Sequence, residues 1–217
     1  MKLFLDIPFE EGNDLENLGL KLDKDYKKWY VSRDMYDRFK KYILDIEEYA
    51  ERIILKDYFY IIVSPYKCQN CGKEMKVINF GIDNYIKIYD NEEDDDPELS
   101  IELEEMDWFG TVMDWSNIPE KLGNFLKENW NYTTFDEQVC PHCNYIQEFF
   151  EIEEDWLNPF HPERDLRFPE NKFKRNDFEF IKVKLINDIL ADMDFSYSTE
   201  HEDLFHFSKH KESDFLL

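Results

Sequence analysis

The sequence predicts an α+β protein in which antiparallel strands and a few helices are joined at a metal site. Three observations predict this class. Two cysteine pairs share the C-x-x-C spacing, Cys68 with Cys71 and Cys140 with Cys143. Segments of alternating apolar residues indicate strands, and segments with apolar residues three and four apart indicate helices. We expect a small β-α-β-β N-terminal module, a helical connector, and a four-cysteine, zinc-ribbon-like antiparallel β domain with an acidic and helical insertion.

These four cysteines are the only cysteines in the chain, and each pair is followed by a residue suited to a tight turn, Gly72 or Asn144. Such a loop directs two thiolates at one ion, and two loops complete the tetrahedral four-thiolate geometry of structural zinc. Between Cys71 and Cys140 lie 68 residues. We therefore expect a structural Zn²⁺ ion to join distant segments, so that its binding energy counts as folding energy.

Three alternatives to zinc exist for the cysteines: buried free thiols, two disulfides, or a redox-active pair. Free thiols have no reason to occur in matched pairs. Disulfides belong to oxidising compartments, and the first five residues, followed by Asp6 and Pro8, do not resemble a signal peptide. A redox C-x-x-C follows a strand, and residues 135–139 suit a strand before Cys140. That alternative stays open for the second pair alone, whereas zinc accounts for both.

The composition is acidic but not that of a disordered chain. There are 26 Lys or Arg against 50 Asp or Glu, for a net charge of −24. This charge disfavours loose binding to nucleic-acid phosphates and to anionic membrane surfaces. An aromatic fraction of 17% argues against disorder. The sequence has no run of about twenty apolar residues and no Gly-rich phosphate loop, so we expect a cytoplasmic protein that does not bind membranes.

Periodicity and turn residues predict the elements of the first quarter of the chain. Residues 2–8 are expected to form a strand, residues 10–18 a short helix, and residues 20–31 a hairpin with a polar turn. From residue 34 apolar residues recur at helical spacing towards residue 54, which predicts a helical connector. In the remainder we expect strands at 56–63, 75–80, 85–89, 145–152 and 178–185, helices at 120–130 and 186–193, and a proline-punctuated linker at 158–169.

Three stretches near the N-terminus, residues 7–9 (Ile-Pro-Phe), 18–20 (Leu-Gly-Leu) and 27–31 (Lys-Lys-Trp-Tyr-Val), carry a resemblance to a known family. They resemble DUF5710, a bacterial module found near the ends of plasmid-transfer proteins of the primase type. The resemblance covers about residues 2–45, and a following C-x-x-C…C-P-x-C segment extends it to about Phe150. The chain departs from the family pattern at residues 15–17, where an alanine-lysine pair is replaced, which weakens the implied contact with nucleic acid.

Trp29 and Tyr30 lie beside Lys24, Lys27 and Lys28 in the sequence, and this group has two interpretations. The preferred one is a core strand, because aromatic and β-branched residues suit a pleated, half-buried surface. The other is a binding surface on which a ring stacks on a base while the lysines contact phosphate. Nucleic acid would be favoured if these lysines share one face with Lys73 and Lys76.

Residues 90–107 form a separate acidic segment, in which 11 of 18 residues are Asp or Glu and none is Lys or Arg. We expect a solvated loop. The alternative is a decoy that imitates a phosphate backbone or docks a basic protein, since blocks of like charge are often interaction segments. Calcium binding is disfavoured because residues 94–97 lack the ligand spacing and turn glycine that a calcium loop requires.

The histidines give weak indications of chemistry. His201, His206 and His210 are interpreted as part of a polar tail, with a second metal site as the less favoured alternative. His142 lies inside the second cysteine pair and is interpreted as a surface side chain, because four thiolates already complete the coordination shell. We find no pairing of a nucleophile with a base, and therefore expect no catalytic residues.

The sequence thus predicts three segments and a binding function. The segments are a DUF5710-like module with its connecting helix (1–50), a split zinc-ribbon-like domain (51–157), and a linker with a C-terminal strand and helix (158–217). We expect a non-catalytic, zinc-stabilised bacterial protein that binds a protein or nucleic acid. The alternative is an acidic inhibitor or decoy of mobile-element origin, and a metal-dependent enzyme is less favoured. The residues specify neither the partner nor the oligomeric state.

Overall fold

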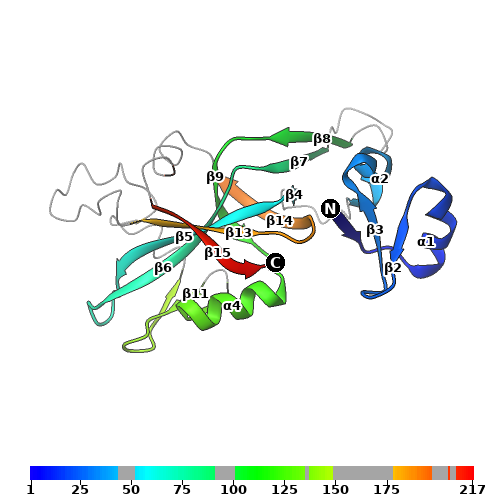
Figure 1. Ribbon diagram of the computed structural model, residues 1–217. Coiled ribbons are helices and arrows are strands. Elements are labelled where there is room, and N and C mark those ends of the chain that lie inside the picture. The colour runs from blue at the N-terminus through cyan, green and yellow to red at the C-terminus, as the bar shows by residue number, and fades with distance from the viewer. Residues whose placement is uncertain (44–51, 91–100, 135–136, 149–177, 197–204, 206–208) are drawn as a thin grey trace.

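The computed structural model describes residues 1–43, 52–90, 101–134, 137–148, 178–196, 205 and 209–217 (Figure 1). In these residues the chain has a mixed α+β fold that consists mostly of antiparallel strands with few helices, as predicted. The strands form one nine-stranded sheet and two three-stranded sheets. No helix in the described ranges is long and apolar enough to cross a membrane.

The N-terminal module is a three-stranded antiparallel sheet with short helices packed on one face. Leu3, Trp29 and Val31 point from this sheet into a core that includes Phe39 of the second helix. The same core takes in Ile54 from the large sheet, so the module packs directly against the rest of the molecule. The elements are β1 (Lys2–Leu5), α1 (Phe9–Leu15), η1 (Glu16–Leu18), β2 (Lys21–Asp23), β3 (Lys28–Ser32), η2 (Arg33–Met35) and α2 (Tyr36–Ile43), with sheet order β1-β3-β2.

The large sheet is antiparallel except at one edge, where β13 and β15 run parallel. Its strands come from residues 52–115 and 179–216, so it spans the predicted segment boundary at residue 157. The strands are β4 (Arg52–Leu55), β5 (Tyr58–Lys67), β6 (Glu74–Ile82), β7 (Tyr85–Asp90), β8 (Ile101–Met106), β9 (Gly110–Trp115), β13 (Glu179–Lys184), β14 (Ile189–Ser196) and β15 (Lys209–Leu216), in the order β15-β13-β5-β6-β9-β14-β4-β7-β8.

Two segments predicted as helix are strands. The connector was expected to continue as helix to residue 54, but α2 ends at Ile43 within the described residues and Arg52–Leu55 is strand β4. Residues 186–193 were also predicted to be helical, but Ile189–Ser196 is strand β14. The two strands pair with each other. Short apolar runs buried on both faces have no period that separates strand from helix, so the available pairing partner decides.

The acidic segment is more ordered than the predicted loop in the part that the structure describes. Residues 101–106 form strand β8, which pairs with β7 at the end of the large sheet. Leu103 faces the core shared with the N-terminal module, whereas Glu102 and Glu104 are exposed. Residues 91–100 lie outside the described ranges, as does the predicted linker 158–169.

A second small sheet follows the helix predicted after Pro119. Helix α4 (Glu120–Trp130) buries Leu122 and Leu126 against the large sheet. It is capped at its C-terminus by Asn131, whose φ is 54°. Three short strands, β10 (Tyr132–Thr134), β11 (Glu137–Val139) and β12 (Ile146–Glu148), form the sheet β10-β11-β12. The β11–β12 connection carries the second cysteine pair, and the β5–β6 connection carries the first.

Candidate metal centre

The two cysteine loops have the same backbone geometry. In each, the residue four positions after the first cysteine donates its N–H to that cysteine's carbonyl: Gly72 to Cys68 at 2.8 Å and Asn144 to Cys140 at 2.9 Å. Both turn residues have positive φ, 68° for Gly72 and 59° for Asn144. Gly and Asn adopt this left-handed conformation at the lowest cost, which explains why each pair ends in one of them.

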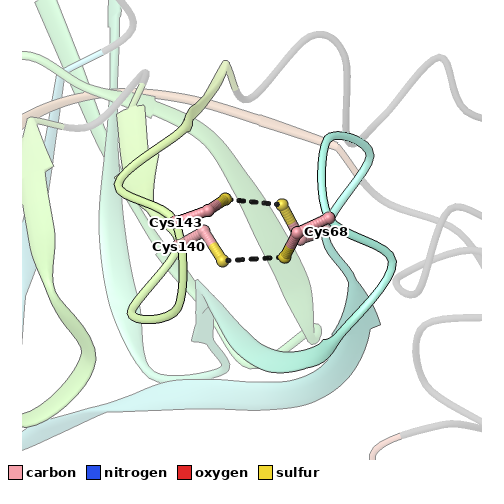
Figure 2. A group of neighbouring side chains, drawn as sticks. Cys68, Cys140 and Cys143 are labelled. Atoms are coloured by element: carbon pink, nitrogen blue, oxygen red, sulfur yellow. Dashed lines mark hydrogen bonds between the residues drawn. The ribbon is translucent and has the colours of Figure 1, made fainter.

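All four sulfur atoms lie in one cluster between the loops. Cys68 Sγ lies 3.7 Å from Cys143 Sγ, and Cys71 Sγ lies 3.8 Å from Cys140 Sγ. Figure 2 shows Cys68 on one loop facing Cys140 and Cys143 on the other. The four ligand atoms all lie within 4.8 Å of one another, and none of the cysteines forms a disulfide. The predicted cluster is confirmed: the cysteines are close enough to bind one metal ion.

Polar hydrogens lie beside the two sulfur atoms of the second pair, and at Cys143 they favour the thiolate form. Asn70 donates its side-chain amide to Cys143 Sγ at 3.6 Å, and the His142 N–H lies 3.5 Å from Cys140 Sγ. The hydrogen bond from Asn70, followed by one from the Tyr145 backbone N–H, lowers the pKa of Cys143 to about 6. Because metals bind the thiolate and not the thiol, this environment prepares the site for a cation.

Two buried glutamines fix the second loop beside the large sheet. The side-chain amide of Gln138 accepts from the Ile78 N–H and donates to the Ile78 carbonyl, both at 2.8 Å. Strand β9 pairs with β6 only at Gly81 and Ile82, the last two residues of β6. The backbone of Ile78 on that side of β6 is therefore available to a side chain. Gln147, opposite Gln138 on β12, accepts from the Gln69 N–H at 3.2 Å. These two amides fix the position of the second cysteine loop relative to the first.

The glutamine contacts were not predicted from the sequence. Gln138 and Gln147 occur in strands of three residues each, and nothing in such short segments distinguishes a buried amide from an exposed one. His142 is exposed, as predicted, and its Nε2 lies 2.9 Å from the Glu74 carbonyl oxygen. That contact adds a third link between the loops on their outer side.

Trp29 belongs to the core, as the preferred interpretation had it. Its exposed fraction is 2%, and it packs against helix α1 at Gly12. A Cβ atom at Gly12 would lie 2.0 Å from the Trp29 ring, so the helix and the ring are in the closest contact that the backbone allows. Trp29 therefore contributes nothing to an outer binding surface.

Tyr30 and the neighbouring lysines lie on the other side of the module. Tyr30 is half-buried, and Lys24, Lys27 and Lys28 are exposed. The β2–β3 hairpin and the tip of the β5–β6 hairpin lie at opposite ends of the molecule (Figure 1), so these lysines do not gather with Lys73 and Lys76. The structure therefore does not bring the two lysine groups together.

The C-terminal histidines do not form a metal site in the described residues. His210 lies on β15, where its Nε2 is 2.7 Å from the Phe205 carbonyl oxygen and its ring stacks on Phe180 at 5.4 Å. His201 and His206 lie outside the described ranges. Among the residues that the structure describes, the four cysteines are the group placed to hold a metal ion.

The fold and the site thus define an α+β protein with four cysteines clustered between two hairpin loops, close enough to bind a metal ion. Searches of protein-family models, of curated proteins and of solved structures found no match to this chain. The resemblance of the first 45 residues to DUF5710 stays a prediction.

Proposed function

We propose that this chain is a non-catalytic binding protein stabilised by one structural Zn²⁺ ion, held in a zinc-ribbon-like arrangement of two loops. The sulfur geometry carries the proposal. A regular tetrahedron with zinc–sulfur bonds of about 2.3 Å has edges of about 3.8 Å. The two contacts between the loops, Cys68 to Cys143 and Cys71 to Cys140, measure 3.7 and 3.8 Å.

The donor set and its spacing favour zinc over the alternatives. Four thiolates are soft ligands that select zinc or iron rather than magnesium or calcium. A disulfide requires sulfur atoms about 2.05 Å apart, which is far shorter than the contacts in the cluster. A redox-active C-x-x-C needs only its own two sulfur atoms. Here the sulfur atoms of both pairs lie in one cluster, which a redox function of the second pair alone does not explain.

A structural role follows from the completeness of the shell. A catalytic zinc ion keeps a coordination position for water or substrate, whereas a site with four protein ligands is closed. Cys68 and Cys140 are buried, and Cys71 and Cys143 are half-buried. The ion would hold the β11–β12 loop, and with it helix α4, against the large sheet. The protein would then act through a surface that this fold presents to a protein or nucleic acid.

Metal analysis of the intact chain tests the proposal. The full-length protein is purified without added metal, and its mass is measured under native conditions before and after chelation. One zinc ion per chain is the expected result, and Cys71→Ser should reduce zinc retention. Lys73→Ser changes an exposed side chain of the same loop that is not a ligand, so it is the matched control and should keep the ion. A metal-free protein with oxidised cysteines would refute the proposal, and iron in place of zinc would correct the metal.

The acidic decoy is a second candidate, favoured by strand β8. Its exposed carboxylates Glu102 and Glu104 lie two residues apart on an ordered strand, so they point to the same side about 7 Å apart. Salt-sensitive binding to the basic polypeptide protamine measures this function. The double change of Glu102→Gln and Glu104→Gln should weaken that binding more than Glu120→Gln with Glu128→Gln on α4. Equal weakening would count against a dedicated surface.

A further inference from the structure

The outer face of the β1-β3-β2 sheet carries a connected group of three aromatic rings. The centroid of Phe4 lies 5.4 Å from that of Tyr26 and 6.0 Å from that of Tyr30. Tyr26, in the turn of the β2–β3 hairpin, is 67% exposed, and the other two rings are half-buried. Helices α1 and α2 contribute to the core on the opposite face with Trp29. The three rings, called the aromatic face below, therefore lie on the opposite side of the sheet from helices α1 and α2.

The turn that presents Tyr26 is held in one conformation by a buried carboxylate. Asp23 accepts hydrogen bonds from the backbone N–H groups of Asp25 at 3.0 Å and Tyr26 at 3.1 Å, and it forms an ion pair with Lys2. Lys2 Nζ also lies 4.7 Å from the centroid of the Tyr30 ring. The aromatic face is thus pre-organised, which reduces the entropy lost when a partner binds.

Exposed lysines outnumber exposed carboxylates near the aromatic face, although the protein as a whole is strongly acidic. Residues 1–43 carry nine Lys or Arg and nine Asp or Glu, so the net charge of −24 lies in the rest of the chain. Asp23 is engaged by Lys2 and two backbone amides, and Asp34 accepts a hydrogen bond from Ser32. Exposed cations lie near the rings on β2, on β3 and in the turn: Lys21, Lys24, Lys27 and Lys28. One exposed carboxylate, Asp25, lies in the same turn.

We propose that the aromatic face binds single-stranded nucleic acid, with bases stacked on Tyr26 and Tyr30 and the surrounding lysines in contact with phosphates. The proposal rests on the binding function proposed above and names its partner class. Aromatic platforms flanked by cations are the usual means of binding single strands, because every base has a ring face that can stack. An anionic partner also complements the charge of this face.

Single strands fit this face better than a duplex does. The bases of a duplex are stacked on each other, and their edges are reached by elements that enter a groove. A sheet face with short turns offers no such element. A duplex also carries one charge per about 1.7 Å of axis, so it would bring more negative charge close to the acidic body than a short single strand would.

Fluorescence anisotropy with a labelled twelve-nucleotide oligouridylate, and with oligothymidylate of the same length, tests the proposal on the full-length protein. Binding should be saturable at low salt and weaker for a duplex of equal length. Tyr26→Ala should weaken binding by about 5- to 150-fold, the loss expected for one stacked base, whereas Tyr26→Phe should retain most of it. Tyr145→Ala, an exposed tyrosine beside the metal centre, is the matched control and should bind like the unchanged protein.

The lysines are tested through salt dependence. The double change of Lys24→Gln and Lys28→Gln removes two phosphate contacts, which should reduce the slope of log affinity against log salt concentration by about 1.4. Lys73→Gln with Lys76→Gln at the first cysteine loop should leave the slope unchanged. Comparison of oligouridylate with oligothymidylate shows which of these RNA and DNA strands binds more tightly.

Two outcomes would overturn the inference. One is the lack of saturable binding up to about 100 µM protein, the weak limit of non-specific nucleic-acid binding. The other is a Tyr26→Ala variant that binds as tightly as Tyr145→Ala. Zinc content is measured on each sample, because a protein that keeps its zinc but does not bind oligonucleotide refutes this inference and leaves the structural-zinc proposal intact. Tyr26 is exposed, so its replacement should not affect folding.

Discussion

Arg33 and Asp188, which are 155 residues apart in the sequence, form the ion pair that fastens the N-terminal module to the large sheet. Arg33 Nε donates to Asp188 Oδ2 at 2.7 Å, and its Nη2 donates to Asp188 Oδ1 at 2.5 Å. Tyr36 adds a third hydrogen bond to the same carboxylate. The Asp188 side chain has an exposed fraction of 0%, and its N–H donates to the Lys2 carbonyl at 2.9 Å. One residue therefore joins β1, η2 and α2 to the β13–β14 turn.

Asp188→Ala should lower the free energy of unfolding by about 3 kcal/mol, because it leaves the Arg33 guanidinium and the Tyr36 hydroxyl without their shared partner. Loss of one partner of a buried ion pair usually costs about 3–5 kcal/mol. We expect the lower end of that range because Arg33 is 35% exposed. Asp57 accepts from the same guanidinium but is 47% exposed. Its φ is 58°, a conformation that Asn tolerates better than Ala, so Asp57→Asn is the comparison and should cost about 1 kcal/mol or less. Urea unfolding of the two variants measures the difference. Equal losses would show that burial of Asp188 does not matter.

Glycines on two helices form a matched pair for testing the core of the N-terminal module. A Cβ atom at Gly12 would lie 2.0 Å from the Trp29 ring, whereas at Gly123 on α4 the nearest atom, in Ile118, is 4.0 Å away. Gly12→Ala should therefore destabilise the protein by about 1–3 kcal/mol through overpacking. Gly123→Ala should stabilise it by about 0.5–1 kcal/mol through helix propensity. Thermal unfolding of both variants checks the signs, and stabilisation by Gly12→Ala would contradict the packing described for Trp29.

Gln138→Ala should destabilise the contact between the second cysteine loop and β6. The change leaves the N–H and carbonyl of Ile78 without the side-chain amide that now binds both. An unsatisfied buried polar group costs about 1–3 kcal/mol, so a loss of about 2 kcal/mol or more is expected. Hydrogen exchange at the Ile78 amide should become faster. Gln69→Ala removes the hydrogen bond from an exposed amide to Tyr66 but leaves both groups of Ile78 bonded, so it is the control. Unchanged exchange in Gln138→Ala would contradict this prediction.

Removal of the metal should weaken the whole fold, since the proposed ion joins loops 68 residues apart in sequence. Excess EDTA is expected to lower the midpoint of thermal unfolding, and added zinc should restore it, because metal binding energy contributes to folding. EDTA saturated with magnesium is the control for effects of the chelator itself. If EDTA leaves the midpoint unchanged in a protein shown to have lost its zinc, the ion does not stabilise the fold.

Asp83 should make stability depend on pH in an unusual direction. Burial raises the pKa of this carboxyl above its ordinary value, and Tyr60 donates to it at 3.3 Å. A carboxyl whose pKa is higher in the folded state favours folding when protonated. This contribution is therefore lost as the pH rises from the unfolded-state pKa, about 3.9, through the folded-state pKa.

Asp83→Asn removes the charge and keeps an acceptor for Tyr60, so it should stabilise the protein at pH 7, with the gain shrinking towards pH 4. Thermal unfolding across this range measures the effect. Asp57→Asn is the comparison, because the hydrogen bond from Arg33 lowers the pKa of Asp57, and the change should destabilise the protein at pH 7. A gain from Asp83→Asn that does not vary with pH would contradict the titration of Asp83.

The parts of the fold that could be predicted are those fixed by local chemistry. Helix α4 begins after Pro119 as predicted because a proline suits the start of a helix, and the strand predicted at 178–185 is β13 because its apolar residues alternate. The helix predictions for 34–54 and 186–193 were wrong at the residues that form β4 and β14. There the apolar residues belong to strands that pair with each other across the sequence. No local signal announces such a partner.

The sequence by itself determined which four cysteines form the candidate metal site, because the spacing within each pair and the turn residues Gly72 and Asn144 shape each loop locally. Only the tertiary structure decided which side of a strand is covered. In the folded protein Trp29 is buried against Gly12 and Tyr26 is exposed. Asp188 lies beside Arg33, with which it forms an ion pair. These outcomes depend on where helices and strands distant in the sequence come to rest, because burial is a property of the assembled layers and not of a single strand.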